Sequence, residues 1–255
     1  MKLLTTTQLS MKLFLTFFLI FFSSISQSKL LVIGHRGAKG HVAENTLASI
    51  KKAIELGADG IEIDVFRCLS GEIVLFHDKK LDKLTDGTGL IEQTTLNDLK
   101  KLKVLGSNEQ IPTLNEVLEI IDKKTFLNIE LKGKNTAKLS LEIVKNYIKN
   151  GKIISKNILF SSFDWEELKN LRDLDSKVNI ALVTENNPLD AIEPALNLQA
   201  IAINPTHKKL NNKVVKQIFN AGLKIYTWTV NDDKQIEKMK QLGVNGIITD
   251  YPERI

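Results

Sequence analysis

From residue 29 onward, the chain alternates between two kinds of segment. Short runs rich in β-branched and apolar residues are followed by amphipathic stretches of helical period, which is typical of strand–helix units repeated around a parallel sheet. The chain has 255 residues and 43% hydrophobic content, enough to bury one full-sized core. A single α/β barrel of the TIM type, a (β/α)8 barrel, uses nearly all of such a chain. We therefore predict one barrel domain over residues 29–255.

Periodicity gives the expected elements of this barrel. Strands are expected at Leu31–Gly34, Gly60–Phe66, Glu72–Phe76, Phe126–Leu131, Asn157–Ser161, Val178–Val183, Ala200–Ile203, Lys224–Val230 and Gly246–Thr249. Helices are expected at Asn45–Leu56, Leu96–Leu102, Leu114–Ile121, Ala137–Lys149, Asp164–Leu171, Asn211–Asn220 and Asp232–Gln241. These strands are one too many for an eight-stranded barrel, so one strand should lie outside the repeat.

The short connection between Arg67 and Glu72 identifies the additional strand. A parallel crossover needs about a dozen residues or more, and this connection is far shorter. The strand that begins at Glu72 should therefore pair antiparallel with the strand before it, as a hairpin. Pairing Arg67 with Glu72 would place Glu62 opposite His77.

Residues 1–28 have the layout of a signal peptide or membrane-targeting leader. Lys2 and Lys12 are the only charged residues of this segment, Leu13–Phe22 is apolar apart from one threonine, and Ser23–Ser28 is mostly small and polar. The apolar run is too short to span a bilayer comfortably. We expect an exported protein that is periplasmic, in the cell envelope or secreted, with membrane contact only through an uncleaved leader. An uncleaved anchor or a mis-started reading frame is the alternative.

The formal net charge of +5 does not indicate a nucleic-acid partner. The lysines are spread over the chain at solvent-facing intervals, with no basic run interleaved with aromatic residues. Cys68 is the only cysteine, which excludes an intramolecular disulfide bond. A small-molecule ligand is the expected partner, and the oligomeric state is not predicted.

Three acidic residues are expected to meet inside the barrel. Alternate residues of a strand face one side, so Glu62 and Asp64 should point inward together while Ile63 faces the helices. The same spacing places Glu130 and Lys132 on one face of another strand. Three inward carboxylates form an oxygen-rich site for one hard divalent cation, Mg²⁺ or Ca²⁺, rather than for zinc. Lys132 would stand beside a phosphate, or simply neutralise Glu130, or do both.

Two histidines follow strands, where a barrel carries its reactive residues. His35 and Arg36 follow the first strand, and His77 follows the hairpin strand. An imidazole and a guanidinium side by side favour an active site over an incidental turn. Trp228, near the end of a late strand, either walls a pocket or fills the barrel, and Phe163 is in the same position.

The ordered motifs of the chain resemble those of the glycerophosphodiester phosphodiesterase family. The matching segments are His35–Gly37, Glu44–Thr46, Glu62–Asp64, His77-Asp78, Leu81–Gly89, Ile111–Leu118, Glu130–Lys132, Trp228-Thr229 and Gly246–Pro252. They cover the chain after the leader and are more specific together than any one motif. Ala43 stands where the family usually has a proline, which bears on loop rigidity rather than on chemistry.

The resemblance implies metal-dependent hydrolysis of glycerophosphodiesters to glycerol 3-phosphate and an alcohol. Glu62, Asp64 and Glu130 would hold the cation, with His35 as the base and His77 as the acid. The resemblance leaves the 2-hydroxyl of the glycerol or a water molecule as the nucleophile.

The remaining roles concern the substrate and the alternatives to this activity. Arg36 and Lys132 would draw charge from the phosphate oxygens, and Trp228 and Phe163 would contact the substrate. A phospholipase D acting on lysophospholipids or sphingolipids is the alternative on the same barrel. A binding protein that captures phosphodiesters without cleaving them is a further alternative, which loss of one histidine would favour. The loops carry no obvious apolar insertion, which favours soluble substrates such as glycerophosphocholine and glycerophosphoethanolamine.

Overall fold

A computed structural model describes residues 29–255, and the predicted leader lies outside these residues. The strands are β1 (Leu31–His35), β2 (Gly60–Arg67), β3 (Ile73–Leu75), β4 (Phe126–Leu131), β5 (Ile158–Ser162), β6 (Ile180–Thr184), β7 (Ala202–Pro205), β8 (Lys224–Thr227) and β9 (Gly246–Thr249). The helices are α1 (Leu47–Glu55), α2 (Leu96–Leu99), α3 (Leu114–Ile120), α4 (Ala137–Lys149), α5 (Trp165–Leu174), α6 (Ile192–Asn197), α7 (Asn212–Asn220) and α8 (Asp233–Leu242). Within this range no helix is long and apolar enough to cross a membrane.

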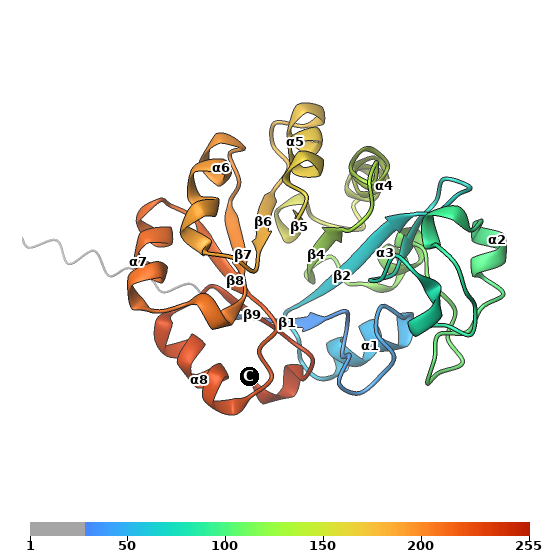
Figure 1. Ribbon diagram of the computed structural model, residues 1–255, viewed down its shortest axis with the longest axis horizontal. Coiled ribbons are helices and arrows are strands. Elements are labelled where there is room, and N and C mark those ends of the chain that lie inside the picture. Colours follow the sequence, from blue (N-terminus) through green and yellow to red (C-terminus); the bar gives the residue numbers. More distant parts are fainter. Residues whose placement is uncertain (1–28) are drawn as a thin grey trace, which may run out of the picture.

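Eight parallel strands close into a barrel. Their order is β1-β9-β8-β7-β6-β5-β4-β2, and β2 pairs again with β1. The helices surround this ring of strands (Figure 1). β3 is the ninth strand, bonded antiparallel to β2 outside the ring. The predicted barrel with one additional antiparallel hairpin strand is confirmed.

The two faces of each strand serve two different cores. On β2, Ile61, Ile63 and Val65 are fully buried against the surrounding helices, in the larger of the apolar clusters. A smaller cluster fills the barrel interior and includes Ile33, Phe126 and Ile248 with other inward side chains. This period-two division leaves Glu62 and Asp64 on the inward face, as predicted.

The predicted register of the hairpin is wrong by one residue. Arg67 pairs with Ile73 rather than with Glu72, and the amide of Phe76 donates to the Asp64 carbonyl. The reason is a tighter turn: the Cys68 amide donates to the Glu72 carbonyl, and Gly71 takes a positive φ of 108° that closes a three-residue loop. His77 therefore leaves the ladder without standing opposite Glu62.

The segment between β3 and α3 forms an excursion at one side of the barrel (Figure 1). It has its own apolar cluster, which includes Phe66, Phe76, Leu81, Ile91 and Leu99. The excursion holds the strand end that carries His77. The sequence pattern places these residues in the chain but does not predict that they form a separate core.

Most helices begin at side-chain caps that the sequence makes recognisable. Thr46 caps α1 by accepting from the Ser49 amide, and Thr113 with Glu116 forms a reciprocal capping box at α3. Helix α6 is not among the expected helices, because six residues are too few to show a period, and Pro194 lies within them. Expected and observed bounds of the other elements agree within three residues at each end.

Candidate active site

Three carboxylates, two from β2 and one from β4, meet inside the barrel. Asp64 and Glu130 are partners in the β2–β4 register, and Glu62 lies two residues before Asp64 on the same inward face. Oxygen atoms of Glu62, Asp64 and Glu130 lie within 4.8 Å of one another. Glu62 and Asp64 are 3% and 1% exposed, so water does little to separate their charges.

This crowding divides the three carboxyl groups by pKa. Burial, followed by the charges of Asp64 and Glu130, raises the pKa of Glu62 well above its ordinary value. Burial and the charge of Asp64 raise the pKa of Glu130 to about 7. Burial also acts on Asp64, but Arg36, His77 and Lys132 outweigh it and lower the pKa of that carboxyl. The raised pKa values of Glu62 and Glu130 show that the chain's own cations only partly balance the negative charge of the cluster.

Two cations of the chain neutralise part of the acid cluster. The Arg36 Nε atom lies 3.1 Å from Asp64 Oδ2, and the Lys132 ammonium lies 2.9 Å from Glu130 Oε1 and 3.9 Å from Asp64 Oδ1. The predicted neutralisation of Glu130 by Lys132 is confirmed. Both cations also line the pocket described below, so the ion pairs leave them beside any ligand in it.

The loop after β1 holds Arg36 in an unusual backbone conformation. Arg36 has a φ of 51°, in the left-handed region that a bulky residue rarely takes. Its amide donates to Glu62, its carbonyl accepts from the Asn45 amide, and its guanidinium donates to Glu44. The following Gly37 packs so tightly on Ser49 that a Cβ atom would lie 2.4 Å from the Oγ atom. These contacts stabilise a strained turn, which is common at functional sites.

His35 is oriented by a carboxylate from the far end of the chain. Its Nδ1 atom lies 2.6 Å from Asp250 Oδ1, and its Nε2 atom lies 4.0 Å from Glu62 Oε2. Asn231 holds Asp250 in turn, donating to its Oδ2 atom and accepting from its amide. Burial lowers the pKa of His35, although Asp250 opposes this effect. Burial acts on Asp250 as well, but the hydrogen bond from His35 lowers the pKa of that carboxyl, so it is an acceptor.

His77 belongs to a second, more open pair. Its Nδ1 atom lies 2.6 Å from Asp78 Oδ1, and its Nε2 atom lies 3.3 Å from the Lys132 ammonium. The side chains of His77 and Asp78 are 29% and 31% exposed. Burial, together with the charges of Arg36 and Lys132, lowers the pKa of His77. Both imidazoles are therefore mainly neutral at pH 7 and face the acid cluster.

One pocket contains all nine of the predicted site residues. They are His35, Arg36, Glu62, Asp64, His77, Glu130, Lys132, Phe163 and Trp228. The empty volume of the pocket is about 370 Å³. Phe163 and Trp228 meet edge to face with ring centroids 5.5 Å apart, and the Lys132 ammonium lies 5.4 Å from the Phe163 centroid. The structure thus brings these residues together, including the two aromatic rings.

Sequence reasoning missed several polar residues of the site. Asp250 and Asn45 lie inside segments noticed as motifs, yet only the closed barrel shows that Asp250 meets His35 and that Asn45 donates to Asp64. Asn128 shares the inward face of Glu130 on β4, so the period of two could have identified it. Asn204 of β7 also lines the pocket, and nothing in its local sequence separates it from a structural asparagine.

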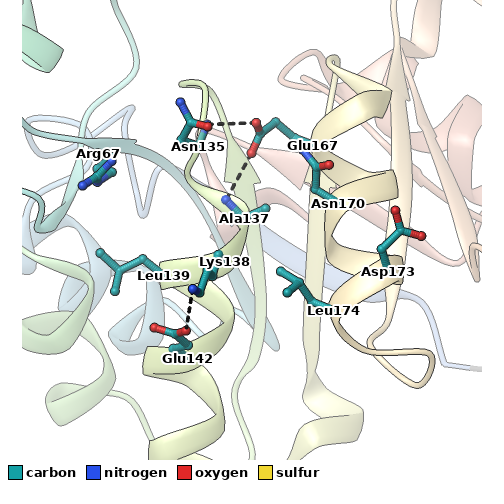
Figure 2. Close-up of a pocket in the computed structure, with 10 residues that line it drawn as sticks. All are labelled: Arg67, Asn135, Ala137, Lys138, Leu139, Glu142, Glu167, Asn170, Asp173 and Leu174. Carbon is teal, nitrogen blue, oxygen red and sulfur yellow. Dashed lines mark hydrogen bonds and ion pairs between the residues drawn. The ribbon is translucent and has the colours of Figure 1, made fainter.

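A larger hollow, about 1190 Å³ of empty volume, lies between α4 and α5 outside the barrel. Figure 2 shows its lining residues, with the Glu167 carboxylate accepting from the amides of Asn135 and Ala137. These bonds satisfy the N-terminus of α4, where Thr136 makes no side-chain cap of its own. The buried Glu167 therefore has a structural role, and this hollow shows no cluster of reactive groups.

The acid cluster fits a hard divalent cation. Its donors are carboxylate oxygens, without a thiolate, and two of the three carboxyl groups have raised pKa values that a bound cation would reverse. Glu62, Asp64 and Glu130 are the residues that could hold it.

Comparison with known proteins identifies the class. Residues 35–254 match the model of the glycerophosphoryl diester phosphodiesterase family. A glycerophosphodiester phosphodiesterase of Caldanaerobacter subterraneus subsp. tengcongensis is 35% identical over 239 residues, which cover 89% of this chain and 96% of that protein. One of Bacillus subtilis is 30% identical and covers 90% of this chain and 86% of its own.

Solved structures agree. An Oleispira antarctica phosphodiesterase in complex with the product sn-glycerol-3-phosphate has a TM-score of 0.81 and 32% identity, covering 88% of this chain and 94% of its own. A second structure, from Galdieria sulphuraria, has a TM-score of 0.78 and 29% identity, covering 88% of this chain and 96% of its own. The chain therefore belongs to the glycerophosphoryl diester phosphodiesterase family and is an enzyme of the phosphodiesterase class.

Proposed function

We propose that the protein hydrolyses glycerophosphodiesters to sn-glycerol 3-phosphate and an alcohol. The observation that carries this proposal is the convergence of the acid cluster with His35 and His77 in one pocket, from strands far apart in the sequence. The Oleispira antarctica relative, whose structure holds sn-glycerol-3-phosphate, supports the choice of product.

His35 is the base. The ionised Asp250 only accepts hydrogen bonds, so the Nδ1 atom of His35 carries the proton and the Nε2 atom carries the lone pair. The lowered pKa keeps this lone pair free at neutral pH. His35 removes the proton of the nucleophile, which is a water molecule or the 2-hydroxyl of the glycerol. Attack by the 2-hydroxyl expels the alcohol and forms a cyclic phosphodiester, which a water molecule then opens to glycerol 3-phosphate.

His77 is the acid, and the substrate makes it one. In the free chain the positive charges of Arg36 and Lys132 help to keep its pKa low. A bound phosphate brings negative charge to these two cations, so the pKa of His77 rises and the ring takes up a proton. Protonated at Nε2 and bonded to Asp78 through Nδ1, His77 then protonates the leaving alkoxide.

Glu62, Asp64 and Glu130 would hold a single divalent cation, Mg²⁺ or Ca²⁺, which when bound would supply positive charge beside the phosphate oxygens. Arg36 and Lys132 stabilise the same oxygens by hydrogen bonds, as their positions beside the cluster allow. Phe163 and Trp228 contact the organic part of the substrate, because their rings form an apolar edge of the pocket.

The decisive assay measures release of sn-glycerol 3-phosphate by the purified protein. Glycerophosphocholine, glycerophosphoethanolamine and a lysophospholipid are compared with added Mg²⁺, with added Ca²⁺ and with a chelator. We expect turnover of the two soluble diesters with a cation and none after chelation. Cleavage of the lysophospholipid alone would favour a phospholipase D, and tight binding without turnover would favour a binding protein.

We also propose that residues 1–28 direct export and that membrane contact, where present, is limited to this leader. The charge and apolar pattern of the segment support this proposal. Sequencing the N-terminus of the protein from the cell envelope and from the medium tests it. A mature protein that starts between residues 24 and 30 is the expected result, and an intact N-terminus found only in the cell interior contradicts it.

A further inference from the structure

We infer that Asn204 binds the terminal hydroxyl of the glycerol part of the substrate. The inference rests on the proposed function and names a residue that determines its substrate class. It starts from a polar side chain that the fold leaves unsatisfied. Neither the Oδ1 nor the Nδ2 atom of Asn204 has a hydrogen-bond partner among residues 29–255, and the residue is only 1% exposed.

A buried amide without partners is costly to keep in a folded protein. Such groups are rare, and where one is found a ligand or an ordered water completes its hydrogen bonds. The backbone carbonyl of Asn204, unlike its side chain, has a partner: it accepts a hydrogen bond from the Trp228 indole at 2.8 Å. The main chain of Asn204 is therefore fixed, whereas the polar atoms of its side chain have no partner among the described residues.

The side chain of Asn204 points into the pocket. Ala202 belongs to the apolar cluster inside the barrel, whereas Ile203 packs against the surrounding helices. Asn204 therefore faces inward like Ala202, one layer closer to the mouth. It lines the same pocket as His35 and Glu62.

The position of β7 in the barrel indicates which part of the substrate Asn204 contacts. Going around the ring from β2, β7 comes after β1, β9 and β8 in one direction and after β4, β5 and β6 in the other. Asn204 thus lies across the barrel from Glu62 and Asp64, where the phosphate would be held. A group that reaches Asn204 must be a part of the substrate remote from phosphorus.

The chemistry around Asn204 favours a hydroxyl. Its neighbours in the pocket are neutral: Val183, its partner in the β6–β7 register, Trp228 and Ile248. A primary amide donates and accepts at once, which matches an alcohol hydroxyl and not a phosphate oxygen. The 2-hydroxyl is the candidate nucleophile and belongs near His35, so the terminal hydroxyl is the group that can reach across.

The test measures binding separately from catalysis. Calorimetric titration of the purified protein, with Mg²⁺ or Ca²⁺ present, compares sn-glycerol 3-phosphate with propane-1,2-diol 1-phosphate of the same configuration, which lacks only the terminal hydroxyl. We expect the wild-type protein to bind the glycerol ester at least about tenfold more tightly. In Asn204→Leu, a change of similar shape without polar atoms, this ratio should fall to about one.

Val183→Ala is the matched control, because it alters the same wall without removing a hydrogen bond. It should change the affinity for both esters alike and keep their ratio. Asn204→Ala replaces the leucine variant if that variant does not fold. Equal binding of the two esters by the wild-type protein, binding of neither ester, or an unchanged ratio in the Asn204 variants would overturn the inference.

Parallel assays of diester hydrolysis separate the two proposals. If the wild-type protein prefers the glycerol ester but cleaves no diester, the inference about Asn204 holds and the proposed activity is wrong. If the protein cleaves glycerophosphodiesters but binds the two esters equally, the proposed activity holds and the inference about Asn204 is wrong.

Discussion

The two walls of the pocket are built from different kinds of side chain. The wall of β1, β2 and β4 is crowded with charge: it carries His35, the acid cluster and Lys132. The wall of β6, β7 and β8 carries only Val183, Asn204 and Trp228, without a formal charge. Both walls belong to the same closed ring of strands.

This difference indicates a division of work. Charged groups held close in a buried place are destabilising for the free protein, and they stabilise charge that develops during a reaction. Neutral groups exert little effect on developing charge, but their shape and hydrogen bonds select a ligand. Changes in the charged wall should therefore alter turnover, and changes in the neutral wall should alter affinity.

The largest effect is expected from the acid cluster. Glu62→Gln should reduce kcat on the order of 10³-fold or more, because the site then holds the cation poorly and loses several kcal/mol of charge stabilisation. The same variant should raise the Tm of the cation-free protein, since it removes a buried acid crowded by Asp64 and Glu130. Steady-state kinetics and thermal melts measure both effects.

Glu167→Gln is the control, as it changes a buried glutamate that caps α4 outside the pocket. It should lower the Tm and leave kcat unchanged. A Glu62 variant that loses stability and keeps its turnover would assign the acid cluster to folding and not to catalysis.

The two histidines should both be needed for turnover, at different steps. His35→Ala and His77→Ala should each lower kcat on the order of 10²- to 10³-fold. A diester with p-nitrophenol as the leaving alcohol needs no acid, so it should restore most of the rate of His77→Ala and little of that of His35→Ala. If this substrate instead restored the rate of His35→Ala, the acid and base roles would be exchanged. Near-normal turnover of either variant in a folded state would exclude the two histidines as the acid–base pair.

The carboxylates behind the histidines should show a smaller effect. Asp250→Asn should lower kcat about 10- to 100-fold, since it disturbs the tautomer and orientation of His35. Asp250 raises the pKa of His35, so the acidic limb of the pH profile should move to lower pH in this variant. Asp78→Asn, in the more exposed pair, should cost less. An unshifted profile would make Asp250 a purely structural residue.

Cation binding should depend on pH because Glu130 must lose its proton. With a pKa of about 7, this carboxyl should make the affinity for Mg²⁺ or Ca²⁺ about tenfold higher at pH 8 than at pH 6. The folded-state pKa lies above the ordinary value, so the cation-free protein should lose stability as pH rises from about 4.5 to 7. Titration calorimetry and melts test both, and a pH-independent affinity would contradict the role of Glu130.

The smallest effect is expected from the neutral wall and its aromatic edge. Trp228→Ala and Phe163→Ala should raise KM about 3- to 10-fold and leave kcat nearly unchanged, because each ring contributes contact and not charge. A fall in kcat with unchanged KM would show that the division between the two walls is wrong. The measurement is steady-state kinetics on glycerophosphocholine.

Local patterns were enough to predict the barrel and the acid cluster. The bounds of the strands Phe126–Leu131 and Gly246–Thr249 are as expected, because short apolar runs bounded by polar or turn residues identify buried strands in a sequence. The period of two also placed Glu62 and Asp64 on the inward face. The co-location of the predicted site residues followed from the inward face of the strands and from the positions after strands, and their catalytic roles stay predictions.

The features that were missed depend on contacts between distant parts of the chain or on a shift of one residue in strand register. The meeting of His35 and Asp250 requires β9 to pair with β1, which no local window contains. The hairpin register depended on one residue of turn length, which Gly71 decided. The unsatisfied Asn204 is defined by partners that are absent, so only the assembled interior reveals it.

The pairing of β9 with β1 has a consequence for biosynthesis. β9 is made after all the other strands, and it both seals the ring and delivers Asp250 to His35, which was made near the start. While the chain is still being synthesised, the earlier strands have an open edge and His35 lacks its partner Asp250. Competence to cut phosphodiesters should therefore arise in one step with the completion of the barrel, so a partly made chain stays inert toward the phosphodiesters around it.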